Sequence, residues 1–562
     1  MPKQQDTQVP ATESFIRKWA PVFVLSLALA IILIDATLLN VSLSTLVEDL
    51  KTDIQSLQWV ITAYSLTIAA LTITGGRLGD LFGRRKMFIL GAALFAAGSF
   101  IASISNNIAT MILGESIIEG IGAAMMMPAT ASLLVSKYKG RDRGIAFGIW
   151  GGVAAASTAI GPLLGGFLTT YYSWRWGFRI NVFVAALLIL GSFIIKEYRE
   201  KEEKPRLDFI GVILSSVGML SLVYGIIEAS TYGWWTAKKV FSIFGQSYQL
   251  WGLSITPFAI VLGLIILVCF LLWEKRIERL GKTPLVSLHL FSNKPFVSSV
   301  ATTAIFSLGQ AGLIFSIPVF LQAVRGASAF QTGLAMVPMS ITALITAPIG
   351  GFLSHKIPPK RLVQIGLAAF ITGYSIVFLT LNVNTVATDL VIPFIIMGFG
   401  MGSMMASISN MALSAVSPEQ AGEASGVNNT MRQVGSTLGT AIIGAVMLTA
   451  ISTNLTSGIN NSSVIPSGMK QTTDSLVAQQ TSNVEFGGGA RIPSSIPANI
   501  RNEITNISHT AITDGNKEAL AYAISFGVIG LISTIWLPSG TNIEFEKSLV
   551  ERKNKPSVGK RG

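Results

Sequence analysis

The sequence predicts an all-α polytopic membrane protein with about fourteen transmembrane helices. Two observations carry this prediction. Half of the 562 residues are hydrophobic and only 12% are charged, whereas a soluble domain carries roughly 25% charged residues. In addition, apolar runs of about 20 residues, the length that crosses the hydrocarbon core of a bilayer, recur along the chain. Too little polar surface remains to face water, so a soluble globular fold is excluded.

The apolar runs fall into three groups. The first six lie at 20–43, 57–77, 87–106, 108–136, 145–169 and 176–196. Two more, after a charged break, lie at 209–229 and 250–273. The last six lie at 295–320, 330–354, 362–382, 387–415, 429–452 and 519–537. Two six-helix halves suit a transporter that rocks about a substrate held midway between them.

These groups set the expected domain boundaries. We expect an N-terminal tail, a first bundle, two linker helices, a second bundle and a C-terminal tail at 1–19, 20–200, 205–275, 285–540 and 541–562. Within the second bundle, residues 453–516 are rich in Ser, Thr, Asn and Gly. Clusters of these residues between periodic segments are typical of loops, so we predict a long extracellular loop there.

Basic residues set the expected orientation. The turn at 76–86 joins two apolar runs and contains three consecutive cations. The loops after the fourth, eighth and tenth spans are also rich in Lys and Arg, at 137–143, 275–282 and 356–361. Short loops rich in these residues stay in the cytoplasm. We therefore expect both termini in the cytoplasm, and we attribute the net charge of +12 to topology rather than to nucleic-acid binding.

Residue types that catalysis and metal binding need are scarce. The chain has one cysteine, Cys269, and three scattered histidines, His289, His355 and His509. They supply neither a disulfide framework nor a conventional zinc centre. No Gly-rich stretch ends in Gly-Lys-Ser or Gly-Lys-Thr, so no ATP-binding loop is expected. We predict no enzyme, no channel, no metal and no cofactor.

Three acidic residues fall inside the first six predicted spans. Asp35 lies in the first span, and Glu115 and Glu119 lie four residues apart on one face of the fourth. An acid at the bilayer centre costs on the order of 3 kcal/mol, so it is expected to face a cavity or a partner. Such acids can carry a proton or meet a cation. The alternatives are a capped structural Asp35 near the outer interface and a Glu115 solvated at the outer edge.

Small residues and a proline interrupt the fifth span. Gly161-Pro162 is followed by Gly165-Gly166. Glycines allow close helix contact, and a proline removes a backbone hydrogen bond and bends the helix. We predict a hinge between moving helices, with plain tight packing as the alternative.

Together these motifs resemble the major facilitator superfamily and, more narrowly, its fourteen-span drug:proton antiporter family of multidrug exporters. Residues 76–86 are similar to the superfamily's cytoplasmic signature, and residues 161–166 are similar to the antiporter signature, which is the more discriminating because it marks exporters. Other segments that look like the family are 174–176, 180–182, 318–322, 333–338 and 424–435. The resemblance covers nearly the whole chain, from about residue 20 to residue 540.

The resemblance implies roles for residues of the signature. Asp80 would pair with a helix end and with neighbouring cations to latch the outward-facing state. Arg84 and Arg85 would serve the same charge network. The glycines of the signature are Gly76, Gly79 and Gly83.

The resemblance also marks residues inside the spans. Asp35 falls where the family carries an aspartate implicated in proton coupling or cation recognition, and Arg432 is a candidate for a charge network in the second half. Span four departs from the family pattern, because Ser116 and Glu119 stand where Arg and Gln are usual. The cation tied to proton transfer is therefore missing. We expect Glu119, with Glu115, to carry a proton or meet a cationic substrate instead.

The sequence thus predicts a secondary active transporter of the plasma membrane. It would export amphipathic, often cationic compounds in exchange for protons, using the proton gradient and acting as a monomer. Protons and substrate would compete for acids near the midplane, and each would stabilise different facing states. The alternative is a dedicated exporter of one metabolite, siderophore or lipid-like molecule on the same fold.

Overall fold

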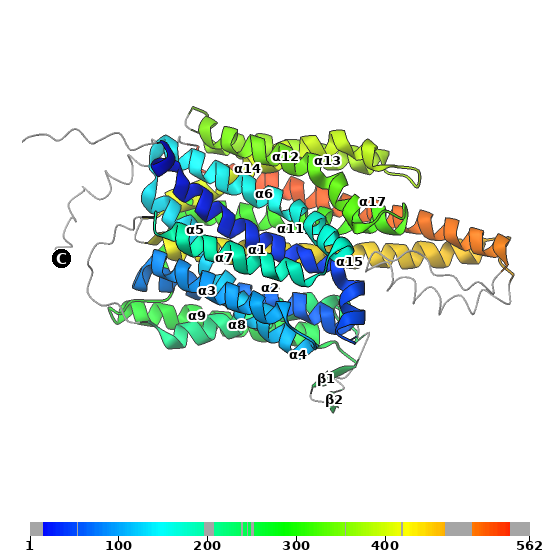
Figure 1. Cartoon of the computed structure of the whole chain (residues 1–562), viewed down its shortest axis with the longest axis horizontal. Helices are drawn as coiled ribbons and strands as arrows, with labels where there is room; N and C mark the ends of the chain where they lie inside the picture. Colours follow the sequence, from blue (N-terminus) through cyan, green and yellow to red (C-terminus); the bar gives the residue numbers. More distant parts are fainter. Residues whose placement is uncertain are drawn as a thin grey trace, which may run out of the picture.

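The molecule is a bundle of long helices that lie side by side along its longest direction (Figure 1). This computed structural model describes residues 15–52, 54–195, 207–237, 240–243, 246–248, 252–354, 356–417, 420–466 and 497–539. In these ranges 13 helices are long and apolar enough to cross a membrane, and a bent helix brings the number to 14. The prediction of a helical fold with fourteen spans is confirmed.

Six spans form the first bundle. Its elements are α1 (Phe15–Asp49), α2 (Ile54–Phe82), α3 (Arg84–Ser103), α4 (Ile108–Met111), the π-helix η1 (Ile112–Glu119), α5 (Gly120–Lys137), α6 (Gly140–Tyr171) and α7 (Arg175–Ser192). The three elements α4, η1 and α5 follow one another without a break and make up the fourth span. We call the end of the bundle that carries the 76–86 turn the signature end, and the opposite end the far end.

Two linker helices lie between the bundles in sequence. They are α8 (Phe209–Tyr232) and α9 (Ile255–Arg279), which pack on each other, while α8 also packs on α2. Large apolar side chains of α9 such as Leu262, Ile265 and Leu272 remain exposed, which is typical of a helix that faces lipid. Between α8 and α9 the chain forms an unpredicted antiparallel hairpin of β1 (Phe241–Ile243) and β2 (Gln246–Tyr248).

The second bundle supplies the other six spans. Its elements are α10 (His289–Ser292), α11 (Lys294–Ala323), α12 (Ala329–Leu353), α13 (Pro359–Thr380), the 3-10 helix η2 (Ala387–Leu390), α14 (Val391–Ser414), α15 (Ala421–Asn461), α17 (Ala498–Ser533) and the 3-10 helix η4 (Thr534–Trp536). Polar residues cap the N-termini of some of these helices. Ser328 and Gln331 form a capping box at the start of α12, and Asn293 caps α11.

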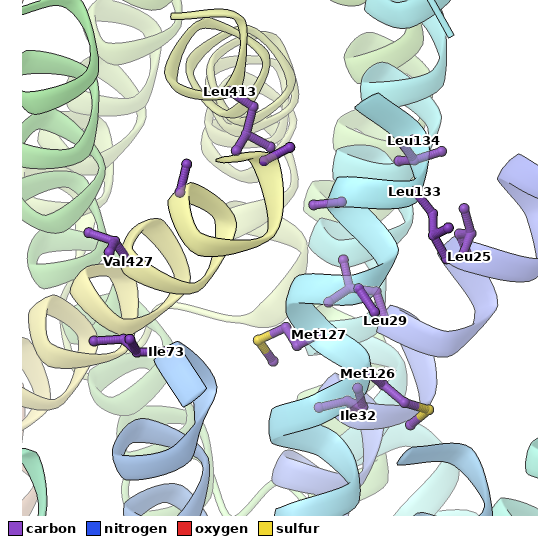
Figure 2. Close-up of a cluster of buried hydrophobic side chains, with 14 of the residues drawn as sticks. Leu25, Leu29, Ile32, Ile73, Met126, Met127, Leu133, Leu134, Leu413 and Val427 are labelled. Atoms are coloured by element: carbon purple, nitrogen blue, oxygen red, sulfur yellow. The ribbon is translucent and has the colours of Figure 1, made fainter. Parts of the chain in front are cut away.

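Glycines let the two bundles approach closely along α6 and α12. A Cβ added at Gly144 would lie 2.4 Å from the carbonyl oxygen of Gly351, and one at Gly148 would lie 2.6 Å from that of Ala347. No larger residue fits there without moving a backbone. The apolar core also continues across the seam between the bundles, because side chains of α1, α2 and α5 share one cluster with side chains of α14 and α15 (Figure 2).

The last two long helices extend beyond the other spans at the far end (Figure 1). The predicted loop 453–516 is therefore too long, because α15 continues to Asn461 and α17 already begins at Ala498. Apolar residues such as Ile459 and Ile504 pack between the two extensions. Their periodic apolar positions are diluted by Ser, Thr and Asn, which is why the composition indicated a loop. The remainder of the predicted loop, 467–496, lies outside the described residues.

Candidate functional site

Three acidic side chains are buried inside the first bundle. Asp35 and Glu115 are 1% exposed, and Glu119 is 0% exposed. Asp35 lies in the interior of α1, about 20 Å of helix rise before Asp49. Asp35 therefore does not cap a helix terminus, and Glu115 is buried rather than solvated. The functional role of these acids stays a prediction.

One amide holds two of the acids together. Nδ2 of Asn181 on α7 donates to Oδ1 of Asp35 at 2.6 Å and to Oε1 of Glu119 at 3.1 Å. The two carboxyl groups also interact with each other directly. Three spans that are separate in sequence thus meet at one polar point. The structure therefore brings Asp35 and Glu119 into the same site.

The acids of span four lie on a π-helix. Residues 112–119 form wider turns than an α-helix, and such segments occur frequently at functional sites. Gly114 packs against α3, where an added Cβ would lie 2.8 Å from the carbonyl oxygen of Gly98. On the α2 side, Oγ of Ser116 donates to the carbonyl oxygen of Val60 at 2.8 Å. Ser116, which replaces the usual cation, therefore anchors the π-helix to α2.

The acid cluster, which we define as Asp35, Glu115 and Glu119, lacks a positive partner. In the described part of the chain no Lys, Arg or His nitrogen lies within 4.0 Å of these carboxyls. There, one oxygen of each acid has no hydrogen-bond partner, and neither does the nearby hydroxyl of Tyr64. Unpaired buried charge is costly. The cluster therefore has room for a proton or a cation as the missing partner.

The predicted hinge lies against the turn of α1 that carries Asp35. The helix α6 bends by 43° between Gly140–Ser157 and Ile160–Tyr171. This break is where Pro162 denies a hydrogen bond to the carbonyl of residue 158. An added Cβ at Gly161 would lie 1.8 Å from Oγ1 of Thr37 and 2.9 Å from the carbonyl oxygen of Ile34.

The same segment of α6 also faces the second bundle. A Cβ at Gly165 would lie 2.8 Å from the carbonyl oxygen of Leu38 on α1, whereas one at Gly166 would lie 3.2 Å from the backbone nitrogen of Phe330 on α12. The bent segment thus contacts the acid-bearing helix on one side and the opposite bundle on the other.

At the signature end, Asp80 joins the two bundles. Its carboxylate accepts from Nε and Nη2 of Arg84 at 3.0 and 2.9 Å. It also accepts from the backbone nitrogens of Gly422 and Glu423, at 3.2 and 2.8 Å, in the first turn of α15. An anion at a helix N-terminus is favoured by the free N–H groups and the helix dipole. These are the contacts that the resemblance implied, with a helix end and a neighbouring cation, and we call them the latch. Their role in holding the outward-facing state stays a prediction.

Other signature residues support this latch. An added Cβ at Gly76 would lie 2.4 Å from the carbonyl oxygen of Gly422, so this glycine permits the close approach of α2 and α15. Gly83 has a φ of 109°, which few other residues adopt, at the start of α3. Arg77 pairs with Glu423 at 3.7 Å. Arg85 lies over the ring of Phe193 at 5.2 Å, and its predicted part in the charge network stays a prediction.

Arg432 lies on α15 and reaches the first bundle. Its Nη2 donates to Sδ of Met127 on α5 at 3.5 Å. The acid cluster does not contact it, so the predicted charge network of the second half has no acid beside its arginine among the described residues. Across the same residues no group of three His, Cys, Asp or Glu side chains could hold a metal ion.

The sequence profile of the Major Facilitator Superfamily matches residues 25–440. The chain belongs to this superfamily. Its relatives include the puromycin resistance protein pur8 of Streptomyces alboniger, 30% identical over 435 residues that cover 76% of this chain and 82% of the relative. The tetracenomycin C resistance and export protein of Streptomyces glaucescens is 28% identical, with 79% of this chain and 78% of the relative covered. Multidrug resistance protein 3 of Bacillus subtilis is 29% identical, with 87% and 90% covered.

Solved structures of the superfamily share the fold. The proton:xylose symporter XylE bound to 6-bromo-6-deoxy-D-glucose superposes with a TM-score of 0.55 at 12% identity, covering 94% of this chain and 98% of that chain. The human organic anion transporter MFSD10 gives a TM-score of 0.52 at 12% identity, with 92% and 99% covered. At such identities the likeness shows the fold alone.

Sequence reasoning missed several members of the site in this major facilitator. Asn181 belonged to a segment that looked like the family, yet no role was expected for it. A single amide inside the apolar run of span six was the available signal, because a buried amide needs partners. Tyr64 and the π-helix gave no such signal, since aromatic residues and glycine are common in any span.

Proposed function

We propose that this protein is a secondary active transporter that exports amphipathic, often cationic compounds in exchange for protons. The acid cluster carries the proposal. Asp35 and Glu119 share the amide of Asn181 and have no cation beside them in the described chain. Intramembrane acids that face one another in a bundle interior are typical of proton and cation pathways. The names of the relatives, which refer to antibiotic and multidrug resistance, support outward transport of drug-like compounds.

Competition at the acid cluster would couple the two fluxes. A proton supplies the missing partner by neutralising a carboxylate, and a cationic substrate supplies it by pairing with one. Each therefore displaces the other. A ligand shifts a conformational equilibrium only by its differential affinity for the two states. Since the bent segment of α6 contacts both the Asp35 turn and α12, occupancy of the cluster would bias the seam between the bundles.

We also propose a membrane orientation, a location, a conformational state and an oligomeric state. With the signature end in the cytoplasm, both termini are cytoplasmic and the protein resides in the plasma membrane. The bonds of Asp80 to Arg84 and to the first turn of α15 close this end, so the described conformation corresponds to the outward-facing side of the cycle. The proton gradient is the energy source, and a monomer contains every residue of the mechanism.

A dedicated exporter on the same fold is the second candidate. The observation in its favour is that two relatives carry the name of a single antibiotic, puromycin or tetracenomycin C. A transport panel of unrelated amphipathic cations separates the two. Transport of several members supports the multidrug function, whereas transport of one compound alone supports the dedicated exporter.

The proposal is tested in inverted vesicles with ethidium, a permanent cation that does not distribute with pH. An acidic lumen should drive ethidium uptake by the wild type, and Asp35→Asn should lose the gradient-driven part. Asp142→Asn is the matched control, because Asp142 lies at the surface in a pair with Lys18. Uptake by the wild type that is the same with and without the gradient would refute proton coupling.

A further inference from the structure

Among the residues that the structure describes, no acidic group balances the charge of Arg432. Its guanidinium donates to Sδ of Met127 at 3.5 Å, and a thioether is only a weak acceptor. In the described ranges no carboxylate lies within 4.0 Å of this side chain. An arginine stays protonated in a protein. A charge inside a membrane span is costly unless it is paired, so an anion is missing here.

Arg432 occupies the seam between the bundles at a central depth. It lies about 16 Å of helix rise from Ala421, which is beside the latch. Its partner Met127 leaves α5 on the side that faces α2 and α15, while the adjacent Met126 points toward α1 (Figure 2). Arg432 therefore lies on a helix of the second bundle and contacts a residue of the first. Its side chain is half-buried.

The fourth span borders both incomplete sites: Glu119 belongs to the acid cluster, and Met127 contacts Arg432. Met127 follows Glu119 by about 12 Å of helix rise. Among the described residues, the acid cluster has no positive partner and Arg432 has no negative one. A molecule of drug size covers a length of about 12 Å. One ligand that carries both charges would therefore satisfy both ends at once.

We propose that the substrates of this transporter are zwitterionic amphipathic compounds, whose acidic group binds Arg432 and whose cationic group binds at Asp35 and Glu119. This inference rests on the proposed function and narrows its substrate class. The planar guanidinium matches a carboxylate in a bidentate pair. The adaptable side chain of Met127 lines the Arg432 end and tolerates varied apolar bodies. A compound with a cation alone leaves Arg432 unpaired and binds less well.

The inference is tested by two dyes that differ only in one charge, a rhodamine with a free carboxylate and its methyl ester. Fluorescence polarisation measures the Kd of each for the full chain in lipid nanodiscs. The wild type should bind the acid at least tenfold more tightly than the ester. Arg432→Gln should weaken acid binding about tenfold, because a hydrogen bond to a charged group is worth about 1.5–3 kcal/mol. Ester binding should change less than twofold.

Controls separate recognition from folding. Arg432→Lys keeps the charge and should retain part of the preference for the acid. Arg325→Gln should leave both Kd values unchanged, because Arg325 is exposed and donates to the carbonyl oxygen of Val383 instead. A variant that misfolds would bind both dyes more weakly, and its elution volume in size-exclusion chromatography would change. The ratio of the two Kd values reports recognition alone.

The outcomes distinguish this inference from the proposed function. Equal Kd values for the two dyes in the wild type, binding of neither dye, or equal weakening of both in folded Arg432→Gln would overturn the zwitterion inference. Gradient-driven ethidium uptake would then still support the proposed function. Conversely, Arg432-dependent acid binding without any gradient-driven uptake would support the recognition of zwitterions and refute proton coupling.

Discussion

The first bundle contains two buried acidic sites that are compensated in opposite ways. At the signature end, Asp80 receives charge-assisted bonds from Arg84 and two backbone N–H groups of α15. In the interior, Asp35 and Glu119 share the amide of Asn181 and interact with each other, and one oxygen of each has no described partner. Burial alone therefore does not distinguish the two sites. In the proposed function, the partners of the acid separate a lock from a site that exchanges its ligand.

Glu119→Gln should have the largest effect, because it removes an exchangeable charge and leaves the shape intact. We expect gradient-driven efflux to fall at least 100-fold, which corresponds to about 2.7 kcal/mol. The measurement is ethidium uptake by inverted vesicles with an acidic lumen. Glu503→Gln, at the far end where Glu503 accepts from Ser462, should leave uptake unchanged. Full activity of Glu119→Gln would mean that the uncompensated site does not carry the coupling proton.

Gly161→Ala should have the next largest effect, through the contact between the hinge and the Asp35 turn. The new Cβ would lie 1.8 Å from Oγ1 of Thr37, and overpacking a core costs typically 1–3 kcal/mol. We expect the Tm of the purified protein to fall by several degrees and turnover to drop. Thr37→Ala in the same chain should recover part of both. Gly309→Ala, where the nearest atom is at 3.4 Å, is the neutral control.

Asp80→Asn should shift the conformational balance while proton coupling remains. Loss of a charged hydrogen bond costs about 2 kcal/mol, or about 30-fold in the ratio of latched to open states. Spin labels at Phe82 and Ile349, both exposed near the signature end, report the distance between the bundles in a Cys269→Ser background. We expect a longer distance to become populated. An unchanged distribution would show that the compensated acid is not a lock.

Asn181→Ala should have the smallest effect of the four. It removes two neutral-donor bonds, each worth about 1 kcal/mol net, and the acids themselves stay in place. Efflux should fall about tenfold, and Asn181→Gln should lose less because it keeps an amide. A loss as large as that of Glu119→Gln would mean that the amide takes part in the exchange rather than in positioning the acids.

The sequence predicted those features that depend on local composition. The apolar runs specified the number and order of spans, and Gly161-Pro162 marked a bend that the structure contains within a few residues. Composition failed at the ends of α15 and α17, where polar residues cover helices that pack on each other outside the bundle. Helix formation there depends on a tertiary contact, which composition does not encode.

The candidate site was only partly predictable for a similar reason. A carboxylate inside an apolar run is conspicuous, so Asp35 and the two glutamates of span four were found. Their arrangement depends on how α1, η1 and α7 pack, and so the shared amide of Asn181 was not anticipated. Arg432 contacts a thioether and, among the described residues, no carboxylate. This likewise follows from its neighbours in space, chiefly Met127. Sequence spacing across 305 residues carries no such information.

The unbroken length of α15 has a mechanical consequence. Its first turn is held by Asp80, and its last residues, near Asn461, extend with α17 beyond the other spans at the far end (Figure 1). With 41 residues it is a rod about 60 Å long. A tilt of about 10° at the held end would carry the far tip through about 10 Å. A fluorophore placed on that tip would thus report gating events that occur on the opposite side of the membrane.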